Sequence, residues 1–277
     1  MTVSIDVNKV RYISLIRMEG GESVLNIPYA ELTVDPDLIA GFVTAVIIFA
    51  NTPIRTIRKA AYDILIEVGE TVLVLLVVDP VPDEVPYRQK LKKILSQVES
   101  KHGTKLRHFE GDVRVFRDFA LNIIKEFPFR LIDLALVPVR RKDGHRIGFR
   151  VGDVDKKLEQ VEAFINGKRT VAEILDLIGL PEDEVIAAIT TLSKYGWLDF
   201  RRRLTENDVL VRRECEGVYL ERLKAQYGNP IDELVLSFDG HKPISEILES
   251  LPLDRNALWF LIRKLVEVGC LGMPDET

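Results

Sequence analysis

Arginine and lysine are the residues whose types and spacing could do chemistry in this sequence. They gather in short runs on a chain whose formal net charge is −5. Arginine and lysine side chains form charge-assisted hydrogen bonds with phosphate oxygens, so such runs are candidates for contact with a nucleic-acid backbone. The candidates are Arg140, Arg141, Lys142, Arg146, Arg150, Arg201, Arg202, Arg203, Arg212, Arg213, Arg255, Arg263 and Lys264.

A solvated face or linker is the ordinary interpretation of each charge run. It stays open for the run at 139–150 and for the run at 201–203. A protein that coats DNA without sequence preference is normally basic overall. The net charge of −5 disfavours that class of protein but leaves local phosphate contact open.

No constellation for catalysis or metal binding is apparent. The sequence has no GxxxxGK[ST] loop and no GxGxxG after a strand. Its histidines lack metal-ligand spacing and are expected at the surface, and no nucleophile with a base can be nominated. We therefore expect a protein that is not an enzyme and needs no metal or cofactor. The histidines are His102, His108, His145 and His241.

Residues 169–200 are predicted to form two short helices, a turn and the start of a strand, the outline of a winged helix. The second helix begins with Glu182, Asp183 and Glu184. Carboxylates there complement the helix dipole. A DNA-reading helix inserts this same end into the major groove, where carboxylates would meet phosphates. We therefore expect that this helix does not enter DNA.

The same pattern occurs twice. Residues 167–198 align without gaps on residues 240–271, at an offset of 73. The recurring apolar residues fall on core positions of a helix-turn-helix, which predicts two winged-helix domains in tandem. The second copy differs, because its second helix begins with Arg255 and Asn256 and also carries Trp259 and Phe260. Exposure of one aromatic side chain and burial of both against a neighbouring domain are both open.

The first half of the chain predicts strands and helices in a defined order. Strands are expected at 10–18 and 22–29, a helix at 36–51, three strands, a helix at 86–102 that ends at Gly103, and a last helix at 112–127. The three strands are 53–60, 61–69 and 70–79. The last of these is nearly all apolar and is expected to be central and buried.

This order resembles the longin fold, a relative of the roadblock domain, and the segments 32–50, 62–78 and 109–116 look like archaeal longin/roadblock-like proteins in particular. The resemblance implies a non-enzymatic platform that dimerises and carries other modules. The fold class expected is α+β, with a five-stranded antiparallel sheet and helices followed by two winged-helix domains. The expected parts are a longin/roadblock-like dimerisation domain at 1–127, a basic connector at 128–152, and winged-helix domains at 153–206 and 207–277.

The helix expected at 36–51 is apolar on two faces, whereas packing on one sheet needs one apolar stripe. One face holds Leu38, Ile39, Phe42, Val46 and Phe49, and the other holds Ala40, Val43, Ile47 and Ala50. Cover by the last helix is one explanation for the second face. The resemblance implies the other, a two-fold homodimer interface formed by Ala40, Val43, Ile47 and Ala50.

Three classes of function remain. The whole architecture looks similar to archaeal ribosome-dimerising factors, which hold small ribosomal subunits in an inactive, unassociated state. That likeness implies a homodimer that grips the RNA and protein of the small subunit. A dimeric transcription regulator that binds DNA is the second class. A longin/roadblock platform for a small GTPase or another protein is the third.

The cysteines and apolar stretches bear on location. Cys215 and Cys270 are solitary, so no disulfide framework is expected, and Cys270 is expected to be a small buried hydrophobe. The most apolar stretch, residues 38–50, is too short to span a bilayer, and no secretory signal is visible. We therefore expect a cytoplasmic protein without a membrane partner.

Overall fold

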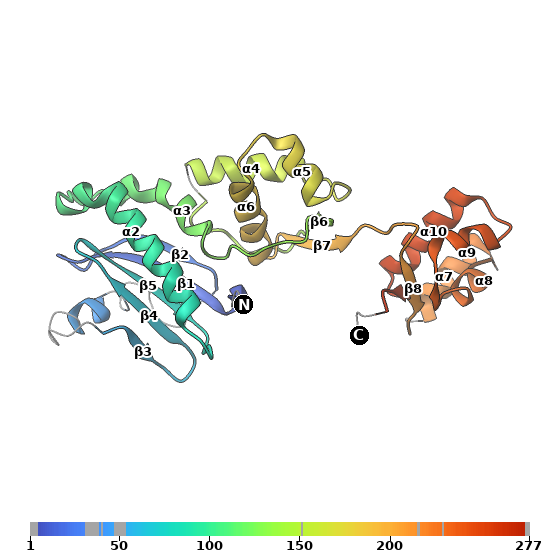
Figure 1. Cartoon of the computed structure of the whole chain (residues 1–277), viewed down its shortest axis with the longest axis horizontal. Helices are drawn as coiled ribbons and strands as arrows, with labels where there is room; N and C mark the ends of the chain where they lie inside the picture. The colour runs from blue at the N-terminus through green and yellow to red at the C-terminus, as the bar shows by residue number, and fades with distance from the viewer. Residues whose placement is uncertain are drawn as a thin grey trace. The chain divides into compact units, whose positions relative to one another are not determined.

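The computed structural model describes residues 5–30, 39, 41–46, 54–150, 152–214, 217–228 and 230–274. They form a mixed α+β structure that divides into two compact units, Met1–Arg202 and Arg203–Thr277, called unit 1 and unit 2 below. Figure 1 draws unit 1 in blue to yellow and unit 2 in orange to red. None of the helices in this part of the chain combines the length and apolarity that a membrane crossing needs.

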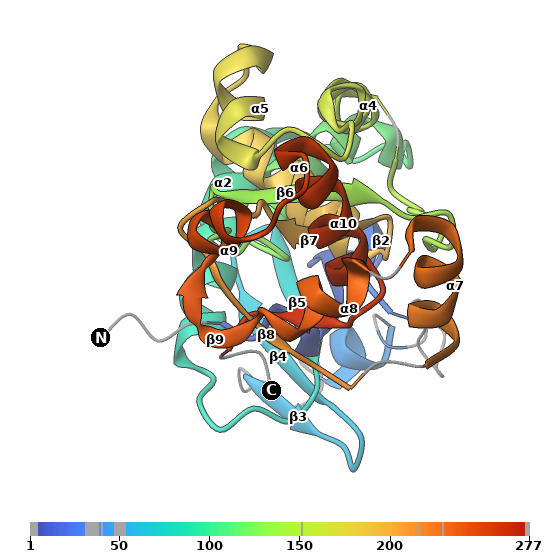
Figure 2. The same ribbon diagram turned by 90° about the vertical axis from the view of Figure 1, so that its right-hand side faces the viewer.

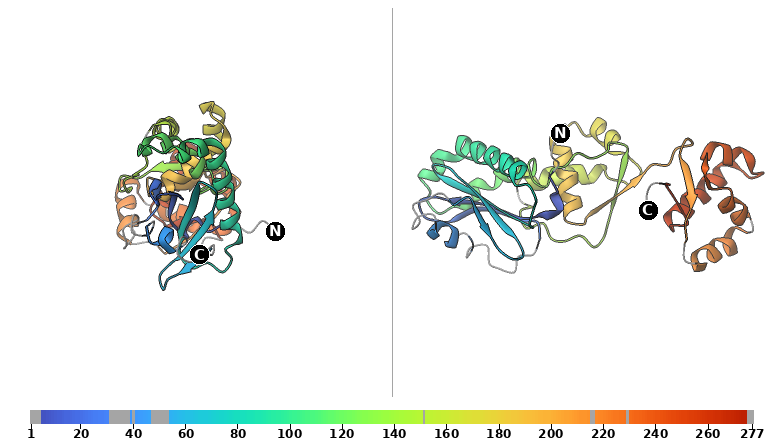
Figure 3. Two further views of the ribbon diagram at one scale, coloured as in Figure 1. Left: turned by 90° about the vertical axis from the view of Figure 1, so that its left-hand side faces the viewer. Right: turned by 60° about the horizontal axis from the view of Figure 1, so that its bottom comes forward.

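Unit 1 contains the predicted five-stranded antiparallel sheet, in the order β2-β1-β5-β4-β3. The all-apolar strand β5 is buried along its whole length because both sheet faces are covered. Helix α2 (Val85–Arg107) packs on one face, and the helical residues Ile39 and Val43 pack on the other (Figure 3). The strands are β1 (Val10–Arg17), β2 (Ser23–Pro28), β3 (Thr56–Arg58), β4 (Asp63–Val68) and β5 (Val72–Val78).

Two helix predictions differ from the structure. Helix α2 continues past Gly103 to Arg107, because the burial of Leu106 outweighs the roughly 1 kcal/mol that a mid-helix glycine costs. The segment expected as one helix at 112–127 is a 3₁₀ helix, η2 (Val113–Phe119), followed by α3 (Ala120–Ile124).

His102 is buried, so the prediction of a surface position is wrong for this histidine. Its ring lies edge-on to Phe116 and Phe119, with centroid separations of 5.5 and 5.8 Å. Burial, together with Lys101 and Lys105 nearby, lowers the pKa of His102. The imidazole therefore serves as a neutral packing group between α2 and η2.

The connector expected at 128–152 is partly a strand. β6 (Leu136–Arg140) pairs antiparallel with β7 (Leu198–Arg202), which follows the first helix-turn-helix. One hydrophobic core runs from β1 to the start of β7, so the predicted break near residue 127 is not a break in packing. The helices between these strands are α4 (Asp153–Phe164), α5 (Val171–Ile178) and α6 (Glu182–Lys194).

Unit 2 repeats this arrangement around its own core and is drawn in orange to red in Figure 2. At the offset of 73, β8 corresponds to β6, and α8, α9, α10 and β10 correspond to α4, α5, α6 and β7. The elements are β8 (Val209–Arg212), α7 (Gly217–Tyr227), α8 (Pro230–Leu236), β9 (Asp239–Pro243), α9 (Ile244–Ser250), α10 (Arg255–Glu267) and β10 (Leu271–Gly272). The duplication thus reaches back to a strand that the sequence alignment did not include.

Cys270 corrects another prediction. It is buried as expected, but it is disulfide-bonded rather than a free thiol. The chain's other cysteine, Cys215, lies outside the described residues. Distance along the chain does not reveal which sulfur atoms meet in space, so the prediction failed. A reducing compartment no longer follows from the cysteines.

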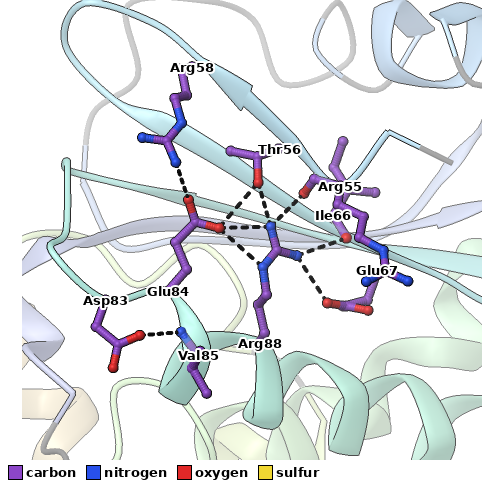
Figure 4. A network of polar contacts seen from close by, with 9 residues as sticks. All are labelled: Arg55, Thr56, Arg58, Ile66, Glu67, Asp83, Glu84, Val85 and Arg88. Carbon is purple, nitrogen blue, oxygen red and sulfur yellow. Dashed lines mark hydrogen bonds and ion pairs between the residues drawn. The ribbon is translucent and has the colours of Figure 1, made fainter.

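Arg88 of α2 ties the edge of the sheet to this helix (Figure 4). Its guanidinium forms ion pairs with Glu84 at 2.9 Å and with Glu67 at 3.0 Å. It also donates to the carbonyl oxygen of Arg55, at the start of the β3 segment, at 2.9 Å. The Arg88 side chain is only 17% exposed, so its charge depends on these partners.

We expect Arg88→Ala to lower the free energy of unfolding by about 2–4 kcal/mol, because it leaves the buried carboxylate of Glu67 without its cation. Arg58 is the matched control, since it binds the same Glu84 but is 75% exposed. Arg58→Ala is expected to cost less than about 1 kcal/mol. Urea unfolding of both variants checks this, and equal losses would contradict the assigned role of burial.

Candidate nucleic-acid interface

Arg140 and Arg150 bind inside unit 1. Arg140 donates a hydrogen bond to the carbonyl oxygen of Glu162 in α4. Arg150 forms ion pairs with Asp155 at 2.6 Å and with Glu162 at 2.9 Å. Burial opposes the charge on Arg150, but its hydrogen bonds to these carboxylates outweigh burial and raise its pKa. Both arginines therefore hold α4 against the segment that precedes it.

Lys142 and Arg146 are the connector residues whose charged groups a phosphate could reach. Both are exposed, and neither forms a hydrogen bond or ion pair within the described residues. Arg141 is exposed too, but it is paired with Asp143 at 2.6 Å and with Asp199 at 3.3 Å. Of the five predicted connector contacts, Lys142 and Arg146 thus remain the stronger candidates for phosphate.

Arg201 and Arg202 are exposed at the end of β7, and Arg203 follows them at the start of unit 2. The pairing of β7 with β6 places Arg201 opposite Val137 and Arg202 opposite Leu136. All three arginines take part in interactions within the chain. A phosphate would therefore compete with contacts that these arginines already make.

Arg213 and Arg255 bind inside unit 2. Arg213 donates to the carbonyl oxygen of Met273 at 2.9 Å. Arg255 forms an ion pair with Glu206 at 2.6 Å, and its hydrogen bond lowers the pKa of Glu206. Arg212, at the end of β8, is exposed and has no such contact within the described residues.

The acidic N-terminus of α6 is docked to other helices. Lys125, which follows α3, lies 2.9 Å from Asp183 and 3.2 Å from Glu184. Lys157 of α4 lies 2.7 Å from Glu184. All residues from 185 to 192 are buried, so the helix has no free side along this stretch. α6 is therefore a core helix of unit 1 along residues 185–192.

We expect Glu184→Gln to lower the free energy of unfolding at pH 7 by about 1–2 kcal/mol, because the lysine hydrogen bonds lose their charged acceptor. Burial raises the pKa of Glu184, but hydrogen bonds from Lys157 and Lys125 outweigh burial and lower it overall. A lowered native pKa stabilises the folded state above the unfolded pKa of about 4.3. The difference between wild type and variant should therefore disappear as the pH falls through the native pKa.

Urea unfolding as a function of pH measures this difference. Glu182→Gln is the control, because Glu182 is exposed at the start of the same helix and forms no ion pair with a lysine among the described residues. Its loss should stay below about 1 kcal/mol, the usual size of a helix-dipole contribution. A Glu184→Gln effect that is unchanged between pH 7 and pH 3 would contradict the docking role.

The outer face of α10 is open and carries aromatic and basic side chains. Phe260 is 45% exposed, and the ring of Tyr227 from α7 lies edge-on to it, with centroids 5.8 Å apart. Lys264 lies over the Phe260 ring at 5.8 Å, and Arg263 lies over the partly buried ring of Trp259 at 5.5 Å. The sequence left open whether Trp259 and Phe260 are both buried or whether one of them is exposed, and Phe260 is exposed.

The equivalent positions in α6 have the opposite environment. Phe260 corresponds to Ala187, which is fully buried, and Arg263 corresponds to Thr190, which is 2% exposed. α4 and α3 pack on α6, and small side chains let them approach. Comparing the two copies position by position would have shown this contrast in the sequence. The same comparison does not point to Tyr227, because its counterpart in the first copy, Val154, is a buried residue of α4.

Of the four predicted dimer contacts, only Val43 lies within the described residues. Val43 is buried against the sheet of its own chain, so its assignment to a dimer interface is wrong. The sheet has two faces to cover, and this helix covers one of them. Phe42 on the same helix is 52% exposed. The other predicted contacts lie outside the described residues; they are Ala40, Ile47 and Ala50.

Cavities in unit 1 are small. One of about 260 Å³ lies beside Arg17, Thr71 and Leu106, and one of about 190 Å³ lies between β2 and η2. Both are below the roughly 300–1,000 Å³ of most small-molecule pockets. Within the described residues, no three His, Cys, Asp or Glu side chains are placed to hold a metal ion.

A scan of the chain against models of known protein families finds no match, and no curated protein matches it either. The resemblance of residues 1–127 to longin and roadblock domains remains a prediction. The function has to be inferred from the chain's own residues and contacts.

Proposed function

We propose that the protein is a non-enzymatic binding factor that contacts the RNA of a large ribonucleoprotein through the outer face of α10. The small ribosomal subunit is the partner that the likeness of the whole architecture implies. The supporting observation is that α10 exposes Phe260 and Arg263 where α6 buries Ala187 and Thr190. An open aromatic face on one copy alone is expected when that copy meets a partner.

RNA suits this face better than duplex DNA does. Aromatic rings and guanidinium planes stack on bases, and basic side chains contact phosphates. Tight non-specific binding of duplex DNA depends instead on many phosphate contacts. Unit 2 holds nine lysines and arginines against fourteen aspartates and glutamates, which does not favour such a surface.

Homodimerisation is part of the proposal, as the resemblance implies. Two copies would carry two α10 faces, and the second face would bind at a raised effective concentration. Such a dimer would bridge two small subunits and obstruct their normal association. The exposed connector residues Lys142 and Arg146 would add phosphate contacts.

Sedimentation tests the proposal. Full-length protein is run through a gradient with small subunits from its host, with large subunits, or alone. We expect it to move with the small subunits and to produce a faster, bridged species. Protein that stays at the top of the gradient with small subunits would contradict the proposal.

A dimeric transcription regulator is the second candidate. The observation that favours it is Asn256, which is exposed at the N-terminal end of α10. DNA-reading helices insert this end into the major groove. Tight binding of a defined duplex DNA, without small-subunit binding, would establish this candidate. Co-purification of a small GTPase, without RNA or DNA, would instead establish a platform function.

A further inference from the structure

We infer that the outer face of α10 binds unpaired RNA nucleotides by stacking their bases beside Phe260 and Tyr227. This inference rests on the proposed function and specifies which part of an RNA would be bound. The two rings are 45% and 38% exposed, and their planes meet at 64°. Each ring therefore keeps surface open to solvent while its partner restricts its rotation.

Unpaired bases are the ligand that matches exposed rings. In an RNA duplex the base faces are covered by neighbouring pairs, and proteins contact sugars and phosphates instead. In loops, bulges and ends the base faces are open, and each stacked base contributes about 1–3 kcal/mol. Phe260 of α10 and Tyr227 of α7 would have nothing to stack on in a continuous duplex.

The basic side chains beside the two rings favour binding of a short stretch of RNA. Arg263 and Lys264 lie next to the aromatic side chains, and Lys264 is also paired with Glu267 at 2.7 Å. Two phosphate contacts on a single strand give a log–log salt slope of about −1.4. A protein that follows a duplex through six or more phosphates would have a much steeper slope.

A protein helix is the other occupant that an exposed helix face could receive. The flanks of this face argue against it, because Asn256 and Arg263, one helical turn before and after Phe260, are exposed polar residues. A helix-binding groove is lined mainly by apolar side chains. The polar rim and the local positive charge favour a ligand with planar rings and phosphates.

Fluorescence anisotropy of labelled RNA tests this inference with the full-length protein. The probes are an unstructured oligouridylate and a blunt RNA duplex of the same length. We expect the single strand to bind more tightly than the duplex, with a salt slope near −1.4. Phe260→Ala should weaken binding of the single strand about 5–150-fold, which corresponds to one lost stacking contact.

Phe260→Tyr keeps an aromatic ring and should bind within about threefold of wild type, a change below the roughly 1 kcal/mol of one stacking contact. Leu236→Ala is the control, because Leu236 is also exposed in unit 2 but lies on α8. Binding of the duplex as tightly as the single strand, or no effect of Phe260→Ala, would overturn the inference. If small subunits bind through Phe260 but neither RNA probe does, only this inference fails. If small subunits do not bind either, the proposed function fails too.

Discussion

Ala187→Glu is expected to unfold unit 1, whereas Phe260→Glu, at the equivalent position of the second copy, is expected to leave unit 2 folded. Ala187 is fully buried in α6, and Phe260 is 45% exposed on α10. An unpaired buried carboxylate costs several kcal/mol, out of the roughly 5–15 kcal/mol that stabilise a domain. At the exposed position the same carboxylate remains in water, and we expect a change below about 1 kcal/mol.

Urea unfolding followed by circular dichroism measures both changes. Ala187→Ser is the control at the buried site, because it changes the volume little and introduces no charge. Similar losses for Ala187→Glu and Phe260→Glu would contradict the assignment of α6 to the core and of α10 to the surface. A folded Phe260→Glu protein would also provide a binding-deficient variant for the functional test.

The second prediction concerns affinity for the small subunit. The double variant Phe260→Ala, Arg263→Ala removes one stacking ring and one phosphate contact from the face of α10. We expect the dissociation constant to rise by more than the about 5–150-fold that corresponds to the 1–3 kcal/mol of one stacked base, because a phosphate contact is lost as well. Filter binding with labelled subunits at a fixed, near-physiological salt concentration measures it.

Arg222→Ala provides the charge-matched control, since Arg222 is exposed on α7. It should leave the dissociation constant within about twofold, because a single exposed charge outside α10 adds little at physiological salt. An equal loss from Arg222→Ala and from the double variant would show that binding depends on overall charge. In that case the face of α10 would not be the contact surface.

Local patterns in the sequence predict much of the fold. The alternating and all-apolar runs predict the strands of the sheet, and the repeated apolar positions predict α5, α6, α9 and α10. These features depend on residues close together in the chain. They are visible because burial imposes a period on the sequence within each element.

Features that depend on distant parts of the chain were missed. β6 pairs with β7 across more than fifty residues, so its segment looked like a basic connector. Arg140 looked like a free charge for the same reason, because its partner, Glu162, lies 22 residues away. Arg150 also looked like a free charge, although its partners in α4, Asp155 and Glu162, lie only 5 and 12 residues away. The disulfide bond of Cys270 also gave no signal in the spacing of the cysteines.

The acidic start of α6 indicated only part of its structural role. Glu182, Asp183 and Glu184 predicted that the helix does not read DNA, from the dipole and from phosphate repulsion alone. In the structure, Lys125 and Lys157 bind two of the carboxylates, and the helix is buried over residues 185–192. The helix with an exposed face is α10, which is the equivalent of α6 in unit 2.

Gradient sedimentation of wild-type and Phe260→Glu protein with small ribosomal subunits tests the central claim most directly. The substitution places a carboxylate in the middle of the α10 face, where it would repel RNA phosphates and remove the stacking ring. We expect the wild-type protein to move with the subunits and the folded variant to stay at the top of the gradient. Equal movement of both proteins with the subunits would contradict contact through α10.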